Sequence, residues 1–169
     1  MFNARGPTLK RILVFGNSGS GKSTLARKLC STSNMAHLDL DSLAWQKTSP
    51  PERSPLAVSE LAISDFISCN ENWVIEGCYS DLLEIALPFS NEIIYMNLSV
   101  EACIDNARNR LWEPHKYSSK EAQDNNLEML IAWISQYRER TDTFSELAHK
   151  ELYERYSGKK STMTENDKA

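Results

Sequence analysis

Short apolar runs alternate with helical repeats along most of the chain. Unbroken or nearly unbroken apolar runs occupy residues 11–15, 35–40, 73–76 and 93–98, which is the pattern of strands buried on both faces. Apolar residues at helical spacing fill the intervals between these runs. Strands that alternate with helices form right-handed crossover units, so the pattern predicts an α/β fold in which helices cover both faces of a parallel sheet.

The second half of the chain is mostly helical and ends in a candidate strand. Helical repeats fill most of residues 100–156. Ser99 is a candidate N-cap of the first of these helices. Ser118 and Thr143 each precede a glutamate by three residues, which is the capping-box pattern for the two helices that follow. The segment after Gly158 is a candidate edge strand.

Composition and charge limit what the protein can do. The 169 residues are 41% hydrophobic and 25% charged, which is typical of a globular protein and not of a disordered or fibrous one. The net charge of −4 gives no overall attraction to nucleic acid, so direct nucleic-acid binding is not expected. No apolar stretch reaches the roughly 18 residues of a membrane helix, and the first residues lack the apolar segment of a secretory signal. We therefore expect a cytoplasmic protein without membrane contact.

A glycine-rich segment directly after the first apolar run matches the pattern G-x-x-x-x-G-K-S/T. Glycine reaches positive φ angles, so successive backbone N–H groups can turn inward and surround an anion at the start of the next helix. We expect Lys22 to contact the β- and γ-phosphates of ATP, Ser23 to ligate Mg²⁺ and Thr24 to bind the α-phosphate. The predicted nucleotide-binding residues are Gly16, Asn17, Ser18, Gly19, Ser20, Gly21, Lys22, Ser23 and Thr24.

Three carboxylates follow the next two predicted strands. Asp39 and Asp41 lie on the same side of an extended segment, and Glu76 precedes a glycine that allows a sharp turn. Ligands bind at the carboxyl ends of strands in such sheets, so all three are expected near the glycine-rich segment. We predict that Asp39 supports Mg²⁺ from its outer sphere, Asp41 accepts the proton of an incoming hydroxyl, and Glu76 holds a metal-bound water. The alternatives are a capping or turn role for the aspartates and a solvated strand end for Glu76.

With these segments identified, the chain resembles the adenylate-kinase-like branch of P-loop kinases. It resembles more closely the small bacterial proteins catalogued as AAA-family ATPases, shikimate-kinase-like proteins or "DNA topology modulation" proteins. The resemblance implies a three-layer P-loop NTPase fold with a five-stranded parallel sheet of order 2-3-1-4-5, Mg²⁺-dependent ATP binding and a mobile lid that carries arginines. The matching segments are ILVFGNSGSGKSTLARKL, HLDLDSLAW, WVIEGCYSDLLE, ACIDNARNRLWEPHKY, SKEAQDNNLEML and the stretch from Arg140 to Ser145.

The chain also departs from these relatives. It lacks the Gly-Gly pair of shikimate kinases, and residues 42–72 contain a single arginine, Arg53, where adenylate kinases carry an arginine-bearing insert for the acceptor nucleotide. Glu76 stands where many relatives have aspartate. The resemblance therefore leaves the acceptor open.

We expect a single P-loop kinase-like domain over residues 1–169. Within it we expect an acceptor-side loop at about 42–57 and a lid hairpin at about 108–140. Arg108 and Arg110 are two residues apart, about 200° around a helix, so they cannot both face inward, and Arg108 is favoured as the catalytic residue. Arg140 is favoured over Arg138 because the matching stretch contains it. The predicted acceptor contacts are Asp41, Trp45, Arg53, Tyr79, His115 and Lys116.

The sequence therefore predicts a small kinase that transfers the γ-phosphoryl group of Mg²⁺-ATP to a nucleotide or hydroxyl compound. Its predicted catalytic residues are Lys22, Asp41, Arg108 and Arg140. The alternative is an ATP-dependent regulatory switch that acts through a partner. A GTPase is not expected because the chain has no Asn-Lys-x-Asp motif. The sequence leaves the oligomeric state open.

Overall fold

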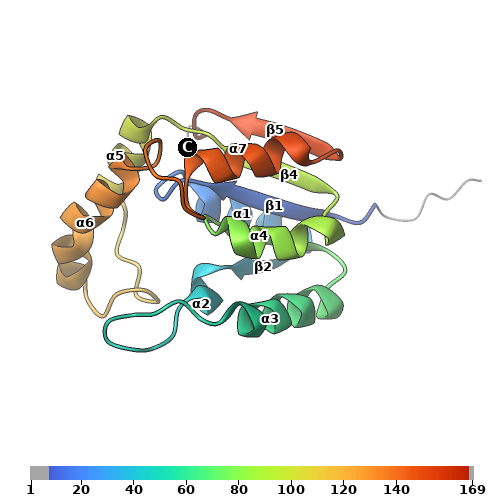
Figure 1. Cartoon of the computed structure of the whole chain (residues 1–169), viewed down its shortest axis with the longest axis horizontal. Helices are drawn as coiled ribbons and strands as arrows, with labels where there is room; N and C mark the ends of the chain where they lie inside the picture. Colours follow the sequence, from blue (N-terminus) through green and yellow to red (C-terminus); the bar gives the residue numbers. More distant parts are fainter. Residues whose placement is uncertain (1–7, 168–169) are drawn as a thin grey trace, which may run out of the picture.

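Five parallel strands form the centre of the protein, whose computed structural model describes residues 8–167. In chain order the strands are β1 (Arg11–Gly16), β2 (Ala36–Asp39), β3 (Trp73–Gly77), β4 (Glu92–Met96) and β5 (Lys159–Met163). They lie in the order β2-β3-β1-β4-β5 (Figure 1). The expected sheet and its order are confirmed. The single-domain expectation also covered residues 1–7 and 168–169, which lie outside the described residues.

Helices cover the sheet on both sides. They are α1 (Lys22–Thr32), α2 (Asp41–Ala44), α3 (Leu56–Cys69), α4 (Ser80–Ala86), α5 (Val100–Arg108), α6 (Lys120–Ser135) and α7 (Glu146–Arg155), with a short 3₁₀ turn at Leu87–Phe89. Side chains of α3, α4 and α7 share one core cluster with one face of the strands, and side chains of α1, α5 and α6 share another with the opposite face. The fold is therefore the expected three-layer sandwich.

The position of β1 at the centre of the sheet explains why its sequence is an apolar run. Leu13 and Phe15 of β1 belong to the core on one face, and Ile12 and Val14 belong to the core on the other. A strand covered on both sides needs apolar residues at every position instead of at alternate ones. At the edge of the sheet, β5 is covered less and most of its residues are exposed, as its polar sequence predicted.

The helix starts differ in part from the predicted ones. Ser99 caps α5 as expected, with its side chain accepting a backbone N–H from the first turn. The caps of α6 and α7 are Ser119 and Ser145, so the choices of Ser118 and Thr143 are wrong. The Thr143 hydroxyl instead hydrogen bonds to the first turn of α4. The Thr143 hydroxyl therefore makes a tertiary hydrogen bond in place of the local capping bond that the sequence pattern predicted.

The carboxyl ends of β1, β2 and β3 meet at one edge of the sheet. The expected lid hairpin stands over this edge and consists of the end of α5, the connection 109–119, α6 and the turns that follow it (Figure 1). The segment expected to form the acceptor-side loop, residues 42–57, connects α2 to α3 and contains an isolated antiparallel bridge between Trp45 and Arg53. None of the described helices is long and apolar enough to cross a membrane.

Candidate functional site

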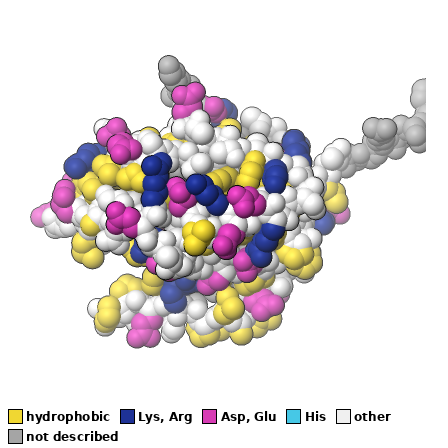
Figure 2. Space-filling view, turned by 45° about the horizontal axis from the view of Figure 1, so that its top comes forward, with side chains coloured by type: hydrophobic (Ala, Val, Ile, Leu, Met, Phe, Trp, Pro, Cys, Tyr) yellow, Lys and Arg dark blue, Asp and Glu magenta, His cyan; other side chains and the backbone are white. Residues whose placement is uncertain are grey.

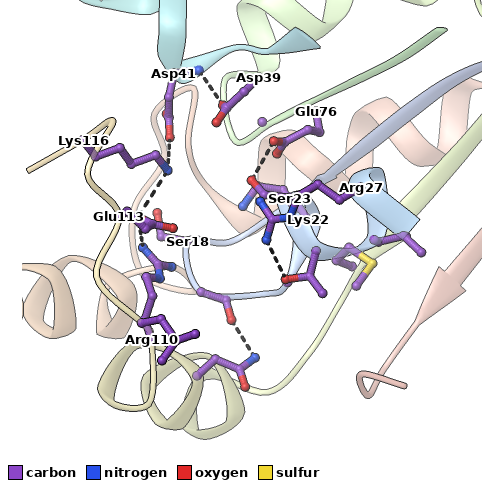
Figure 3. Close-up of a pocket in the computed structure, with 18 of the residues that line it drawn as sticks. Ser18, Lys22, Ser23, Arg27, Asp39, Asp41, Glu76, Arg110, Glu113 and Lys116 are labelled. Carbon is purple, nitrogen blue, oxygen red and sulfur yellow. Dashed lines mark hydrogen bonds and ion pairs between the residues drawn. The ribbon is translucent and has the colours of Figure 1, made fainter. Parts of the chain in front are cut away.

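A pocket of about 740 Å³ opens at this edge of the sheet (Figure 3). Its walls come mainly from residues 18–19, 21–25 and 27–28, the ends of β2 and β3, residues 109–117 of the lid hairpin and the segment around Asn166. On the face shown in Figure 2, Lys and Arg side chains are interspersed with Asp and Glu. That face offers no basic surface for a polyanion, whereas the pocket collects charged groups of both signs in a confined space.

The turn between β1 and α1 requires glycine at two positions. Gly19 and Gly21 have φ angles of 78° and 88°, in the left-handed region that favours glycine. A Cβ atom on Gly19 would lie 2.4 Å from the carbonyl oxygen of Cys103, and one on Gly21 would lie 2.5 Å from the side-chain nitrogen of Asn166. Backbone conformation and close packing thus both explain Gly19 and Gly21.

Two asparagines from distant parts of the chain hold the outer side of this turn. Asn106 Nδ2 donates to the Gly19 carbonyl at 2.8 Å, and Asn166 Nδ2 donates to the Ser20 carbonyl at 3.0 Å. The C=O and N–H of one planar trans peptide point in opposite directions, so the N–H of Gly21 is turned away from Asn166. Within residues 8–167, the N–H groups of Ser18, Gly19 and Gly21 have no hydrogen-bond partner. These three donors can bind an anion.

The lysine and asparagine of the motif take different positions. Lys22 lines the pocket (Figure 3), and its Nζ donates to the backbone carbonyl of Asn17 at 2.7 Å. The Asn17 side chain is buried and donates to the carbonyl of Ile134 in α6, so it fixes the turn instead of facing a ligand. The other motif residues on the pocket wall are Ser18, Gly19, Gly21, Ser23 and Thr24, whereas Gly16 and Ser20 lie outside it.

Glu76 is the penultimate residue of β3 and is 1% exposed. Its Oε1 accepts a hydrogen bond from the Ser23 hydroxyl at 2.7 Å and lies 3.2 Å from Nε2 of His37. The alternative of a solvated strand end is therefore wrong. The hydroxyl predicted to ligate Mg²⁺ and the carboxylate predicted to hold its water are already paired.

Asp39 and Asp41 lie beside Glu76 at the end of β2. Asp39 Oδ1 accepts the N–H of Asp41 at 2.9 Å, so the aspartates also form the local turn that was the alternative interpretation. Burial and the negative charges of Glu76 and Asp41 raise the pKa of Asp39 to about 6. A divalent cation at this edge would relieve that repulsion. In the described part of the chain no three His, Cys, Asp or Glu side chains form a metal site by themselves.

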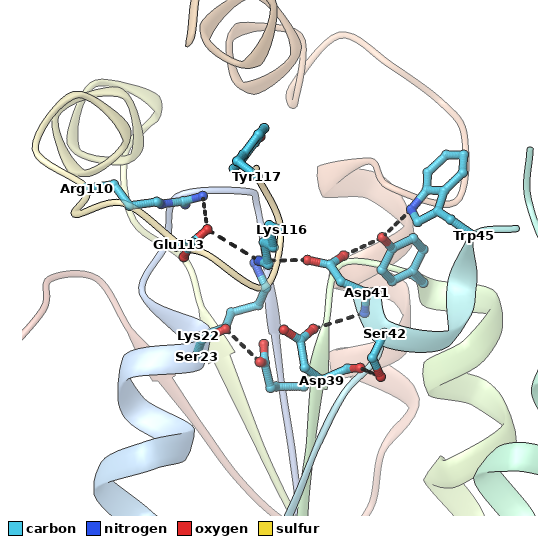
Figure 4. Close-up of polar contacts among 12 residues, drawn as sticks. Lys22, Ser23, Asp39, Asp41, Ser42, Trp45, Arg110, Glu113, Lys116 and Tyr117 are labelled. Carbon is cyan, nitrogen blue, oxygen red and sulfur yellow. Dashed lines mark hydrogen bonds and ion pairs between the residues drawn. The ribbon is translucent and has the colours of Figure 1, made fainter. Parts of the chain in front are cut away.

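Asp41 lies at the centre of a second set of contacts (Figure 4). The hydroxyl of Tyr79 donates to its Oδ1 and itself accepts from Nε1 of Trp45 at 2.8 Å. The ammonium of Lys116 lies 3.1 Å from Oδ2. Burial acts to raise the pKa of Asp41, but Lys116 and the Tyr79 hydrogen bond outweigh it, and the net pKa lies below its ordinary value. Asp41 is therefore a charged carboxylate at neutral pH.

Two cationic side chains of the lid hairpin, Arg110 and Lys116, line the pocket and lie on either side of Glu113. Oε2 of Glu113 lies 3.8 Å from Lys116 Nζ and 3.6 Å from an Arg110 nitrogen, and all three side chains line the pocket with His115. The pKa of Lys116 is raised, because the carboxylates around it outweigh its burial. The Lys116 ammonium group is therefore held charged beside Asp41.

The structure places Arg110, and not the favoured Arg108, on the pocket wall. Arg108 lies outside the pocket, with its guanidinium 3.9 Å from the exposed Glu128 carboxylate of α6. The helix ends at Arg108 and Asn109 is its C-cap, so Arg110 lies in the following turn and reaches the pocket. The argument from helical rotation did not apply because it assumed that both arginines were helical.

Arg53 and Arg140 also lie outside the pocket. Arg53 pairs with Asp81 at 3.0 Å, and Arg140 pairs with Asp142 at 3.1 Å and stacks 3.4 Å above the ring of Trp133. Their guanidiniums lie 5.5 Å and 5.9 Å from the centre of one ring, that of Phe144. Arg53 and Arg140 were expected to contact ligand, but in the structure their guanidinium groups contact carboxylates and aromatic rings of the protein itself. Trp45 and Tyr79 are likewise set behind Asp41 and not on the pocket wall.

A family model matches most of the chain, including most of the segments that form the pocket. The family model described as AAA domain matches residues 12–128, from β1 into α6. The chain belongs to the AAA domain family. The match spans the glycine-rich turn, both carboxylate-bearing strand ends and the pocket-lining connection of the lid hairpin. No curated protein sequence matches the chain.

Solved structures resemble this AAA domain protein in fold. An unliganded sugar kinase from Janibacter sp. HTCC2649 is 10% identical, with a TM-score of 0.50 over 93% of this chain and 86% of that one. Shikimate kinase from Acinetobacter baumannii is 17% identical, with a TM-score of 0.44 over 86% and 92% of the two chains. Shikimate kinase from Bacteroides thetaiotaomicron is 14% identical, with a TM-score of 0.47 over 87% and 98%.

Sequence reasoning missed several residues of this AAA domain protein's site. Asn106, Glu113 and Asn166 carried no recognisable pattern, because their partners lie far away or in an irregular turn. His149 did have a signal that could have found it. It stands four residues after Ser145 and three before Leu152, the spacing of one helix face, and all three are buried in the structure.

His149 leads to a prediction about stability. Burial lowers its pKa to about 4 from the ordinary 6.5. As the pH falls from 6.5 to 4, the unfolded chain binds a proton there and the folded chain does not, so the free energy of unfolding decreases. The contribution of His149 to this decrease reaches at most about 3 kcal/mol. Denaturant unfolding between pH 4 and 7 should show a steeper decrease in the AAA domain protein than in its His149→Gln variant. Parallel curves would contradict the burial of a neutral His149.

Glu76 leads to a prediction about the metal. Glu76→Gln keeps an acceptor for Ser23 and removes the charge, so affinity for Mg²⁺-ATP should fall by roughly 10-fold or more while metal-free ATP binds as before. Isothermal titration calorimetry with and without Mg²⁺ measures both affinities. The matched control is Glu60→Gln on the exposed side of α3. Equal loss with and without Mg²⁺ would assign Glu76 to the architecture of the turn and not to the metal.

Proposed function

We propose that this AAA domain protein is a kinase that transfers the γ-phosphoryl group of Mg²⁺-ATP to a small-molecule acceptor. The observation that carries the proposal is the position of Asp41. A charged carboxylate, bonded by Tyr79 and Lys116, stands at the same pocket as Lys22 and the open backbone N–H groups of the glycine-rich turn. A nucleotide-binding protein without transfer chemistry has no need of such a base.

The glycine-rich turn would bind the phosphates of ATP. The free N–H groups of Ser18, Gly19 and Gly21 and the positive end of α1 offer hydrogen bonds and partial positive charge to the phosphate oxygens. Lys22 would exchange its bond to the Asn17 carbonyl for the β- and γ-phosphates. Mg²⁺, when bound with ATP, neutralises charge on the phosphates. Ser23 would ligate it, and Glu76 and Asp39 would bind its waters.

Asp41 would act on the acceptor. Its lowered pKa keeps it ionised at neutral pH, so it can orient an acceptor hydroxyl and take its proton. The acceptor oxygen then bonds to the γ-phosphorus, the bond from that phosphorus to the bridging oxygen of ADP breaks, and ADP leaves with the electron pair. Arg110 and Lys116 of the lid hairpin replace Arg108 as the proposed source of positive charge for the transferring oxygens.

The acceptor-side loop would form the other wall. Tyr79 hydrogen bonds to Asp41, and Trp45 hydrogen bonds to Tyr79. Arg53 lies over the Tyr79 ring, and Arg140 lies over the ring of Phe144, which packs edge-on against Tyr79. We propose indirect roles for both arginines, through Tyr79 and Phe144, together with a direct acceptor contact for His115. ATP and its acceptor would meet the protein in the cytoplasm.

An acceptor screen tests the proposal. Purified protein with Mg²⁺-ATP is mixed with nucleoside monophosphates, sugars and hydroxy acids, and ADP formation is measured together with the phosphorylated product. Stimulation by one class, lost in Asp41→Asn, is the expected result. ADP formation that no small molecule stimulates, and that responds only to an added protein partner, would favour the regulatory switch instead.

A further inference from the structure

Four groups form a chain of hydrogen bonds beneath the pocket. The hydroxyl of Tyr95 lies 2.8 Å from that of Tyr137, the Tyr137 hydroxyl lies 2.7 Å from Nδ1 of His149, and Nε2 of His149 lies 2.8 Å from the carbonyl oxygen of Cys78. The His149 side chain is 0% exposed, and both tyrosines are 2% exposed. None of these four groups belongs to the glycine-rich turn, and none of them hydrogen bonds to Asp41.

The donors and acceptors of this chain allow a single arrangement. A carbonyl oxygen can only accept, so Nε2 of His149 must carry the hydrogen that it donates to Cys78. In a neutral imidazole Nδ1 then has a lone pair and must accept, which makes the Tyr137 hydroxyl its donor. The Tyr137 oxygen in turn accepts from Tyr95. Each group has one role, so His149 is fixed in one tautomer and one ring orientation.

The two groups that His149 joins, Cys78 and Tyr137, lie at functionally different places. Cys78 is between Gly77, the last residue of β3, and Tyr79, which bonds to Asp41. Tyr137 follows α6 at the root of the lid hairpin, and its carbonyl accepts the N–H of Glu146 at 3.0 Å. His149 therefore connects Cys78, on the pocket wall, with Tyr137, at the start of the segment that follows α6.

We propose that His149 is a positioning residue that ties the root of the lid hairpin to the Cys78 carbonyl and thereby holds Tyr79 and Asp41 in place for phosphoryl transfer. This inference rests on the proposed function. Packing alone does not explain the residue, because an apolar side chain could fill the space without the cost of burying a polar ring. The bonds to Tyr137 and Cys78 are what an imidazole adds.

Two amide variants separate the bond to Cys78 from the bond to Tyr137. In His149→Gln the terminal nitrogen reaches the position of Nε2 and can still donate to Cys78. In His149→Asn the shorter side chain reaches only the position of Nδ1. The expected result is that kcat for transfer falls by roughly 10-fold in the Asn variant with little change in KM for ATP, and that the Gln variant recovers most of the loss. Leu152→Val, a core change on the same helix, controls for lowered stability.

A spectroscopic readout makes the test independent of the acceptor. Nitrogen-15 NMR of labelled histidine in the wild-type protein should show a single neutral tautomer with the hydrogen on Nε2. A hydrogen on Nδ1 would overturn the proposal. So would an Asn variant with the kcat of wild type, or a Leu152→Val variant that loses kcat as far as the Asn variant does. Wild-type protein that phosphorylates no acceptor would refute the proposed function and the positioning role with it, whatever the tautomer.

Discussion

Lys22→Ala is expected to lower the affinity for Mg²⁺-ATP by roughly 10- to 100-fold and to abolish turnover. Hydrogen bonds to charged groups contribute about 1.5–3 kcal/mol each, and the Lys22 ammonium is the one side-chain cation within the motif itself. Its bond to the Asn17 carbonyl holds it at the pocket before any phosphate arrives. Calorimetric titration with a non-hydrolysable ATP analogue and an ADP-release assay measure the two effects.

Lys150→Ala is the matched control for this prediction. Lys150 lies on α7, is exposed and pairs with Glu146 in the same helix, so its removal takes away one positive charge without touching the pocket. Affinity and turnover that stay unchanged in Lys22→Ala would refute the assignment of the glycine-rich turn to nucleotide binding.

Asp41→Asn should reduce transfer by roughly 10²- to 10⁴-fold while ATP affinity stays nearly intact. An asparagine in this place can still accept the Tyr79 hydrogen bond, but it cannot accept a proton from the acceptor. It also removes the nearer of the two carboxylates that pair with Lys116, at 3.1 Å, and leaves Glu113 at 3.8 Å. Steady-state assays with the acceptor found in the screen give kcat, and calorimetry gives the affinity for ATP.

Asp65→Asn controls for the loss of a carboxylate, because Asp65 is exposed on α3 away from the pocket. Equal activity in Asp41→Asn and wild type would remove Asp41 as the base. A large loss of ATP affinity would instead make Asp41 part of the nucleotide site.

The sheet could be predicted because strands that are buried on both faces have a recognisable sequence pattern. Residues 11–15 and 93–98 are apolar runs that only a covered strand needs, and the order of the strands came from the resemblance to P-loop kinases. The glycine-rich turn could be predicted because its chemistry depends on backbone conformation, which glycine positions reveal. Both signals are local in sequence.

The rest of the site depends on where elements end and on what they meet in space. Arg110, and not Arg108, lies at the pocket because α5 ends at Arg108 and Arg110 belongs to the turn that follows. Asn166 reaches Ser20 across 146 positions of the chain, and no local pattern reports such a contact. Arg53 was predicted from its place in the expected acceptor-side loop and Arg140 from the family resemblance, but aromatic rings and nearby carboxylates engage both within the protein.

A structure of the protein with Mg²⁺ and a non-hydrolysable ATP analogue tests the central claim most directly. The predicted result places the β- and γ-phosphates within hydrogen-bond distance of the N–H groups of Gly19 and Gly21, with Lys22 Nζ moved from the Asn17 carbonyl to the phosphates. An analogue bound elsewhere, with the turn empty and Lys22 still on Asn17, would contradict the account.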